Sequence, residues 1–349
     1  MSGTSSISYI GSFPPPYGGV TVKNDLIFRH LSKSLPLEKV DLSRMKALNV
    51  RDTAAFFHAL LSREGSLVLG MSRGWRTRTT LALYMLNRKK MARSVVFVMG
   101  GAIPSGSDVD RLARFRRVYV ETETMRRDFE TVGLPNAAVY PNCRERPRLP
   151  VELRRRTTGE PLNCVYFSHI SVVKGAGVVL RAAAELPEAE FNFYGQITPD
   201  FKDEFLLRVR ALPNATYHGV FDSAKGDAIG ELTRYDVHLF PTMAPHEGVP
   251  GVIVETKVAG LPTLATNRCH NAGLIKDGVD GLLMSGDSSQ EELAREMVEG
   301  LRSLSDDPSL LASMKAAALA SAESFYMDNH VQQLIDALRA QPHSEGSKI

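Results

Sequence analysis

Short apolar runs alternate with helical stretches along almost the whole chain, and this alternation is the feature that most constrains the fold. Runs rich in valine, leucine, isoleucine and aromatic residues have the length of β-strands. They lie at 7–10, 40–42, 67–71, 95–99, 118–120 and 138–140, and again at 164–167, 191–194, 215–218, 237–240, 263–265 and 281–284. Helical spacing of apolar residues appears between them, for example over 178–186, 202–212 and 291–304. The alternation predicts parallel sheets with helices on both faces, because a parallel crossover normally contains a helix.

The chain is long enough for two such sheets. Twelve strands exceed an ordinary open sheet, and the pattern restarts after an Arg- and Pro-rich stretch at 144–161. We therefore predict an α/β protein with two doubly wound domains, residues 1–155 and 156–325, facing each other across a cleft. Residues 326–349 are expected to form a C-terminal helix that packs back on the first domain. Ligands of such sheets bind outside the carboxyl ends of the strands.

The charges are divided unequally between the two halves. Residues 1–155 hold 26 Lys and Arg against 13 Asp and Glu, a net charge of +13, and the remainder carries −10. An anionic partner is therefore expected only for the first half. Nucleic acid is not expected, because no DNA- or RNA-binding motif is present and the basic residues are not interleaved with aromatic ones.

Targeting signals and metal-binding patterns are not found. No stretch has the length and apolarity of a membrane span, and the uncharged run 1–22 has neither a basic region nor an apolar core of a signal peptide. Cys143, Cys164 and Cys269 follow no metal-ligand spacing, which predicts unpaired thiols rather than a metal site. We also expect no cofactor. A cytoplasmic protein is expected, held at the inner face of the cell membrane if its basic half binds lipid.

Two glycine-containing loops follow predicted strands. Gly18 and Gly19 come after the first strand and before a helix expected from about residue 22, where backbone N–H groups favour a phosphate. The dinucleotide pattern G-x-G-x-x-G is absent, and a turn that simply needs glycine is the alternative. In the second half, His169, Lys174 and Gly175 follow the strand at 164–167 and suit a diphosphate, the alternative being a solvated loop.

The segment 241–255 carries the strongest pattern. Pro250 and Gly251 open a predicted helix, and Glu255 lies one turn inside it, where a carboxylate can accept hydrogen bonds from the hydroxyls of a ribose. Glu247 stands just before the loop, placed for a sugar hydroxyl or for charge at a reacting carbon. Helix-capping carboxylates are the alternative for each glutamate.

These residues resemble a known family. Glu247 and Glu255 around Gly248-Val249-Pro250-Gly251 are similar to the signature of the family 4 (group 1) retaining glycosyltransferases. Agreement continues over nearly the whole chain and is most specific in its second half. It includes 13–19, Pro141-Asn142, 165–169 with Lys174-Gly175, 259–266 and 277–283.

The resemblance implies two Rossmann-like domains in the B-type glycosyltransferase fold, a nucleoside-diphosphate-sugar donor, retention at the anomeric carbon and no metal. It implies catalytic roles for Lys174 and Glu247. It assigns donor binding to Gly19, His169, Lys174, Gln196, Val220, Glu247, Gly248, Val249, Pro250, Gly251, Val252 and Glu255, and the acceptor side to Gly18, Gly100 and Gly101. Two positions depart from the family, which usually has Arg at His169 and often has His near Met99.

The expected activity is retaining transfer of a sugar to a saccharide acceptor, lipid-linked, in bacterial surface polysaccharide or glycoconjugate synthesis. An epimerase or hydrolase of nucleotide sugars, and an inactive sugar-nucleotide-binding subunit, remain as alternatives. The donor base and sugar are left open. For the basic half, Leu81, Tyr84 and Met85 share one helical face among basic residues, which predicts docking on anionic lipid; a sheet-packing helix with solvated ends is the alternative. The basic residues are Arg76, Arg78, Arg88, Lys89, Lys90, Arg93, Arg111, Arg114, Arg116 and Arg117.

Overall fold

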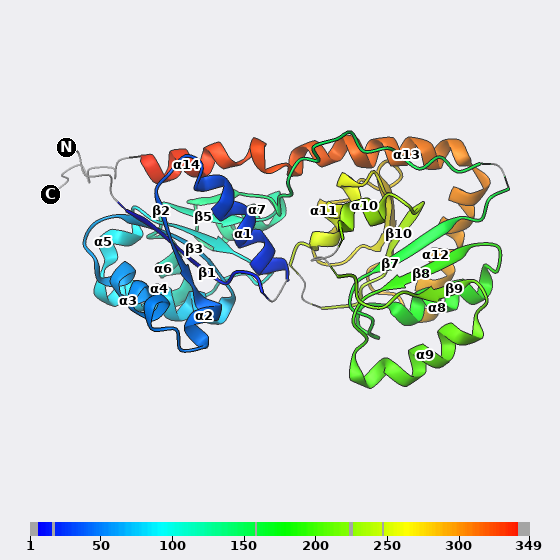
Figure 1. Cartoon of the computed structure of the whole chain (residues 1–349), viewed down its shortest axis with the longest axis horizontal. Helices are drawn as coiled ribbons and strands as arrows, with labels where there is room; N and C mark the ends of the chain where they lie inside the picture. Colours follow the sequence, from blue (N-terminus) through cyan, green and yellow to red (C-terminus); the bar gives the residue numbers. More distant parts are fainter. Residues whose placement is uncertain (1–5, 16–17, 158, 223–225, 246–247, 341–349) are drawn as a thin grey trace. The chain divides into compact units, whose positions relative to one another are not determined.

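The computed structural model describes residues 6–15, 18–157, 159–222, 226–245 and 248–340, which fall into two compact units (Figure 1). One unit combines Met1–Glu145 with Tyr326–Ile349, and the other is Arg146–Phe325. Each holds a six-stranded sheet whose strand pairs are all parallel. The predicted fold class is therefore confirmed, and the cleft stays a prediction.

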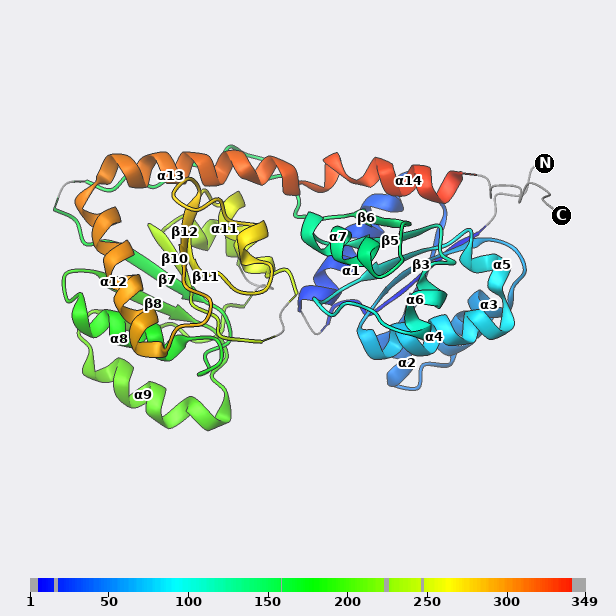
Figure 2. The ribbon, with the colours of Figure 1, turned by 180° about the vertical axis from the view of Figure 1, so that it is seen from behind.

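The first sheet has the order β2-β1-β3-β4-β5-β6. Its strands are β1 (Ile7–Gly11), β2 (Leu37–Asp41), β3 (Ser66–Met71), β4 (Val95–Val98), β5 (Arg117–Val120) and β6 (Ala137–Val139). The helices of this unit are α1 (Gly19–Leu31), α2 (Leu42–Lys46), α3 (Val50–Leu61), α4 (Arg73–Leu86), α5 (Arg88–Met91), α6 (Ser107–Leu112), α7 (Glu123–Thr131) and α14 (Val331–Arg339). Figures 1 and 2 show α1 and α14 on one face of the sheet and α3 and α4 on the other.

The second sheet has the order β12-β11-β10-β7-β8-β9. Its strands are β7 (Asn163–Phe167), β8 (Glu190–Tyr194), β9 (Ala215–Tyr217), β10 (Val237–Phe240), β11 (Thr263–Thr266) and β12 (Gly281–Met284). The helices of this unit are α8 (Ala176–Glu185), α9 (Lys202–Ala211), α10 (Ala228–Leu232), α11 (Gly251–Val258), α12 (Gln290–Asp306) and α13 (Pro308–Ser321).

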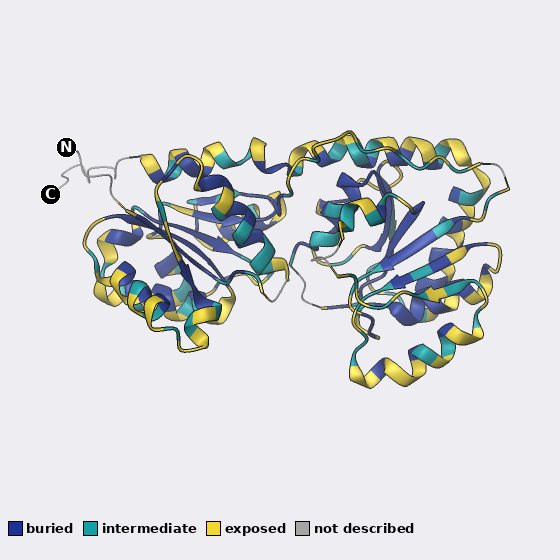
Figure 3. Cartoon of the chain, viewed as in Figure 1, coloured by how far each residue is buried: buried dark blue, intermediate teal, exposed yellow. Residues whose placement is uncertain are grey.

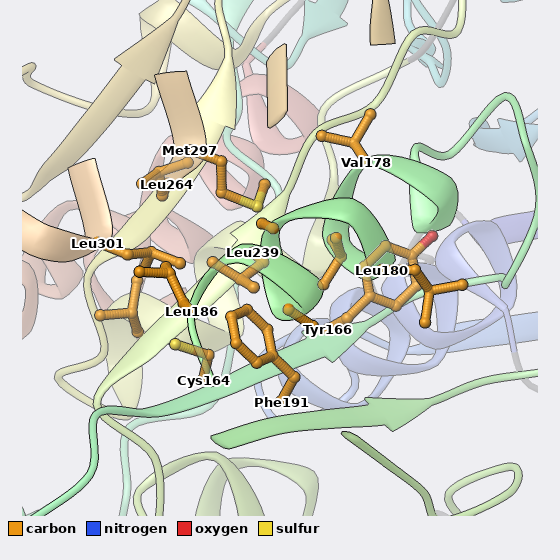
Figure 4. Packing of buried hydrophobic residues seen from close by; sticks show 14 of the residues in the cluster. Cys164, Tyr166, Val178, Leu180, Leu186, Phe191, Leu239, Leu264, Met297 and Leu301 are labelled. Carbon is orange, nitrogen blue, oxygen red and sulfur yellow. The ribbon is translucent and has the colours of Figure 1, made fainter. Parts of the chain in front are cut away.

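The core of the second unit forms where α8 and α12 pack on the sheet (Figure 4). Leu239 of β10 lies there with Leu180 of α8 and Met297 of α12, all of them buried. Burial of such side chains is the main favourable term in folding, and it fixes the strand ends from which the functional loops start.

The chain returns to the first unit after α13. The Met327 N–H donates to the Arg144 carbonyl oxygen at 3.0 Å, and α14 then adds Leu334, Ile335 and Leu338 to the core that α1 forms with the sheet. The Arg116 guanidinium donates to the carbonyl oxygen of Ala337 at 2.8 Å, which holds the end of α14.

The segment before β7 belongs to the second unit. Arg154 donates to the buried carboxylate of Asp236 at 2.6 Å, and Arg146 pairs with Glu323 at 2.7 Å. The first unit therefore ends at Glu145, before the predicted boundary at 155. Within the described residues no helix is both long and apolar enough to cross a membrane.

Candidate functional site

The N-terminus of α11 lies at the carboxyl edge of the second sheet, after β10. Pro250 precedes the first helical residue, Gly251, with no side-chain cap and no acidic residue in the first turn. Uncapped N–H groups and the helix dipole favour an anion at this position. Gly248, Gly251 and Val252 are half-buried, whereas Val249 and Pro250 are buried and fix the loop.

The C-terminal part of α11 is anchored by Lys257. Lys257 binds the Asp280 carboxylate at 2.6 Å and the Ser321 hydroxyl at 2.9 Å, and both members of the ion pair are buried. Burial lowers the pKa of Lys257, and the Asp280 carboxylate counteracts this by raising it. These contacts join α11 to the start of β12 and to the end of α13, so the position of the α11 N-terminus is fixed.

The loop that carries Lys174 contacts the loop after β10. Gly175 has φ of 77°, and a Cβ at this position would lie 2.0 Å from the Pro241 carbonyl oxygen, so only glycine fits. The Met243 N–H donates to the Val173 carbonyl oxygen at 2.8 Å. These contacts bring the Lys174 ammonium to 5.9 Å from the centroid of the Phe240 ring, at the end of β10. The structure thus brings Lys174 to the segment that leads into α11.

A glycine also allows close backbone contact between the loops that follow β7, β8 and β9. At Gly195, with φ of 143°, a Cβ would lie 1.8 Å from the Ser168 carbonyl oxygen, and the Gly195 N–H donates to the Gly219 carbonyl at 2.9 Å. His169 and Gln196, the residues that follow Ser168 and Gly195, are exposed, and Val220 follows Gly219. The predicted diphosphate and base residues therefore follow neighbouring strands at one edge.

The two predicted glutamates differ in what the structure describes. Glu255 is half-buried within α11. Glu247 lies outside the described residues, as does His246. Their roles, like those of the other site residues, stay predictions.

The predicted acceptor-side glycines lie in the first unit. Gly18 precedes α1 and Gly19 is its first residue, and the Gly18 N–H donates to the Thr21 hydroxyl at 3.0 Å. Gly100, with φ of 108°, and Gly101 follow β4, so both pairs stand at the carboxyl edge of the first sheet. Val98 is the last residue of β4, one residue before the predicted end at 99.

Arg268, after β11, and Thr266, the last residue of β11, also hold the site, and the sequence did not lead us to assign a role to Arg268. Arg268 donates to the carbonyl oxygens of Met243 and Gly286, and Thr266 donates to the Thr242 carbonyl at 2.6 Å. Arg268 thereby braces the loop that leads to α11. Its position in the loop that follows the strand predicted at 263–265 is the signal that would have identified it.

His238 lies beneath the site on β10 and is fully buried. Its Nδ1 is 3.2 Å from the Thr263 hydroxyl, and burial lowers the pKa of the imidazole to about 3. The ring is therefore neutral at ordinary pH and belongs to the core.

A cavity of about 770 Å³ lies away from these loops, between 152–156 and α13. Arg154 and Lys315 line it, and both bind the same Asp236 carboxylate. Because those charges are paired, we do not assign a ligand to it. Across the described part of the chain, no three His, Cys, Asp or Glu side chains gather as metal ligands would.

Two parallel six-stranded sheets, each with glycine-containing loops at the carboxyl edge, are the arrangement of the B-type glycosyltransferase fold. Residues 161–303, which include β7 to most of α12, match the sequence profile described as "Glycosyl transferases group 1". The second unit is therefore similar to this profile over most of its length. No curated protein sequence matches the chain significantly.

Solved structures with the same fold cover nearly the whole chain. Alr3699/HepE of Anabaena, in complex with UDP, is 17% identical, with a TM-score of 0.68 over 95% of this chain and 99% of that one. A glycosyltransferase from Rickettsia africae is 14% identical, with a TM-score of 0.69 over 97% and 100%. The lipopolysaccharide outer core galactosyltransferase WaaB is 12% identical, with a TM-score of 0.65 over 95% and 99%. At these identities the likeness concerns the fold.

Proposed function

We propose that this protein transfers a sugar from a nucleoside-diphosphate-sugar to a lipid-linked saccharide, with retention of the anomeric configuration. The observation that carries the proposal is the glycine-enforced contact between Gly175 and Pro241, which sets Lys174 beside the segment leading to the α11 N-terminus. A cation next to uncapped backbone N–H groups suits a diphosphate. The group 1 profile spans this segment, and HepE has also been solved with UDP-glucose.

The chemistry in this proposal is stabilisation of a leaving group. Lys174 and the α11 N–H groups bind the diphosphate, whose negative charge grows as the bond to the sugar breaks. Glu255 accepts hydrogen bonds from the ribose, and Glu247 binds the donor sugar. The acceptor hydroxyl attacks from the face that the diphosphate leaves, and the departing phosphate takes its proton. This route needs no enzyme nucleophile and no metal.

The acceptor binds the first unit in this proposal, at the N–H groups around Gly18, Gly100 and Gly101. A lipid-linked saccharide is the proposed acceptor because the +13 charge of residues 1–155 favours an anionic surface. The enzyme then works at the cytoplasmic face of a membrane, in assembly of a surface polysaccharide or glycoconjugate.

Binding of nucleotides tests the donor site. UDP, GDP, ADP and TDP are titrated by calorimetry, and the one that binds is then titrated into Lys174→Ala. We expect Lys174→Ala to weaken binding at least about tenfold, since a charge-assisted hydrogen bond contributes about 1.5–3 kcal/mol. Lys202→Ala, an exposed lysine at the start of α9, is the matched control and should bind as the unchanged protein does. Equal affinity in the two variants, or no nucleotide binding at all, would overturn the assignment.

Turnover tests the transfer itself. With the sugar donor of the nucleotide that binds, product NMR should show the anomeric configuration of the donor, and EDTA should leave the rate unchanged. An inverted product contradicts retention, and loss of rate in EDTA contradicts a metal-free reaction.

A further inference from the structure

Two helices of the first unit turn large apolar side chains toward solvent. On α3, Val50, Phe57 and Leu61 share one helical face, and Phe57 and Leu61 are 53% and 57% exposed. On α4, Leu81 and Met85 are one turn apart and Met85 is 66% exposed. Exposed apolar residues scattered singly are ordinary, but a contiguous set of them marks an interaction surface.

The two exposed faces adjoin. Phe56 of α3 points inward, and its ring lies edge-on to the Trp75 ring of α4, with 6.2 Å between the centroids. Figures 1 and 3 show the two helices side by side, with exposed residues along their outer faces. We call the outward residues of this pair the α3–α4 face: Val50, Phe57, Leu61, Arg78, Leu81 and Met85.

The structure shows which side of α4 packs on the core. Thr79, Thr80 and Leu83 are buried, so this side of the helix packs inward as an ordinary crossover helix does. Leu81 and Met85 are on the opposite side, exposed. Leu81 and Met85 are therefore not part of the core, whereas Tyr84, which the spacing places on the same face, is half-buried and contacts Arg88 and Arg114.

Positive charge surrounds the α3–α4 face. Between residues 44 and 93 there are eleven basic residues against Asp52 and Glu64, a net charge of +9. They are Arg44, Lys46, Arg51, Arg63, Arg73, Arg76, Arg78, Arg88, Lys89, Lys90 and Arg93. Arg76 and Lys90 are buried and Arg93 is half-buried, whereas the other eight are exposed and available to an anionic partner. Within the described residues, only Arg44 of this set forms an ion pair, with the buried Asp52.

We propose that the α3–α4 face docks on an anionic lipid bilayer. Phe57, Leu61 and Met85 enter the boundary between headgroups and acyl chains, and the surrounding arginines and lysines bind the anionic headgroups. A symmetric contact with a second copy would set two basic surfaces against each other, which Coulomb repulsion disfavours. An anionic bilayer satisfies both the apolar and the basic residues.

Docking of this surface extends the proposed function, because a first unit held at a membrane would meet an acceptor carried by a lipid. Only this purpose of docking rests on the proposed function. Docking itself involves no residue of the donor site. Vesicle binding without nucleotide and nucleotide binding without vesicles therefore test the two proposals separately.

The experiment is co-sedimentation of the full chain with vesicles of phosphatidylcholine, with and without phosphatidylglycerol, at low and high salt. We expect pelleting only with phosphatidylglycerol, and its loss in high salt as screening shortens the reach of the charges. Each basic residue near an anionic surface raises binding about fivefold, so Arg78→Gln with Lys89→Gln should lower it more than tenfold. Phe57→Ser with Met85→Ser should lower it about tenfold or more, because the inserted apolar area is lost.

Leu207→Ser is the matched control. Leu207 is 72% exposed on α9 of the second unit, and its replacement should leave vesicle binding unchanged. Equal pelleting with both lipid mixtures, or no response to the α3–α4 variants, would overturn the proposal. So would a concentration-dependent dimer that Phe57→Ser with Met85→Ser abolishes, since it would assign the surface to a second copy.

Discussion

Glu255 is half-buried on α11, the helix whose N-terminus forms the centre of the candidate site. If its carboxylate binds the ribose hydroxyls, Glu255→Ala should weaken binding of the free nucleotide by about 1–3 kcal/mol, as expected when a charged hydrogen-bond acceptor is removed. Calorimetric titration measures this. Glu299→Ala, an exposed glutamate on α12, is the control. Unchanged affinity in a folded Glu255→Ala protein would show that Glu255 does not bind the ribose.

His238 makes the second unit sensitive to acid. Burial lowers the pKa of its ring to about 3, whereas an unfolded histidine has a pKa near 6.5. Between these values the unfolded chain binds a proton that the folded chain does not. The stability that the neutral ring contributes is therefore complete above about pH 6.5 and is lost as the pH falls toward 3.

Replacement of this histidine isolates the effect. His238→Gln keeps a polar group near Thr263 but does not titrate, so its free energy of unfolding should fall less steeply below pH 6.5. The difference in slope should approach about 1.4 kcal/mol per pH unit. Denaturant unfolding at several pH values measures both slopes, and parallel curves would mean that another group controls the response.

At the scale of elements, the contact between the Lys174 loop and β10 depends on one glycine. Gly175→Ala places a Cβ 2.0 Å from a carbonyl oxygen at positive φ, so the loop must move. We expect a loss of about 1–3 kcal/mol in unfolding free energy and weaker nucleotide binding as Lys174 shifts. Gly278→Ala is the control: with φ of 72° and open space around the new methyl group, it introduces the same backbone strain without a steric clash. Nucleotide affinity equal in both variants would contradict a positioning role for Gly175.

The elements that the sequence predicted well are those whose cause is local. Most strands are short runs of apolar or β-branched residues, and Pro250-Gly251 marks the start of α11 in the sequence as in the structure. The exception is β2, which contains Glu38 and Lys39 and covers 37–41 instead of the predicted 40–42. Which side of a helix faces the core is not determined by the local sequence. The spacing of Leu81 and Met85 shows that they share a face, but only the packing of Leu83 on the core shows that this face points outward.

Long-range pairing explains the difference at the domain boundary. Residues near 150 are polar and basic, which is typical of a linker, yet Arg154 binds Asp236, a residue far along the chain. Composition alone cannot identify that partner. Gly175 and Gly195, which position Lys174 and Gln196, were visible as residues, but the carbonyl oxygens that they approach belong to loops that follow neighbouring strands of the sheet.

At the scale of the whole molecule, the first unit is built from two separate segments. A fragment of residues 146–325 contains a complete sheet and core, and we expect it to fold and to bind nucleotide. A fragment of residues 1–145 lacks α14, which supplies Leu334, Ile335 and Leu338 to its core. We expect this fragment to unfold without cooperativity, measured by circular dichroism during heating. A sharp transition at the temperature of the full chain would show that α14 is dispensable.

The late position of α14 has a consequence for biosynthesis. Domains usually fold in the order in which the ribosome makes them. Here the second unit is one uninterrupted segment, so it is complete while the first still lacks its last helix. A nascent chain that stops before residue 331 presents an unfinished first core to cellular proteases. Only a chain that includes α14 closes this core, so survival of the protein in the cell would report that translation has passed residue 339.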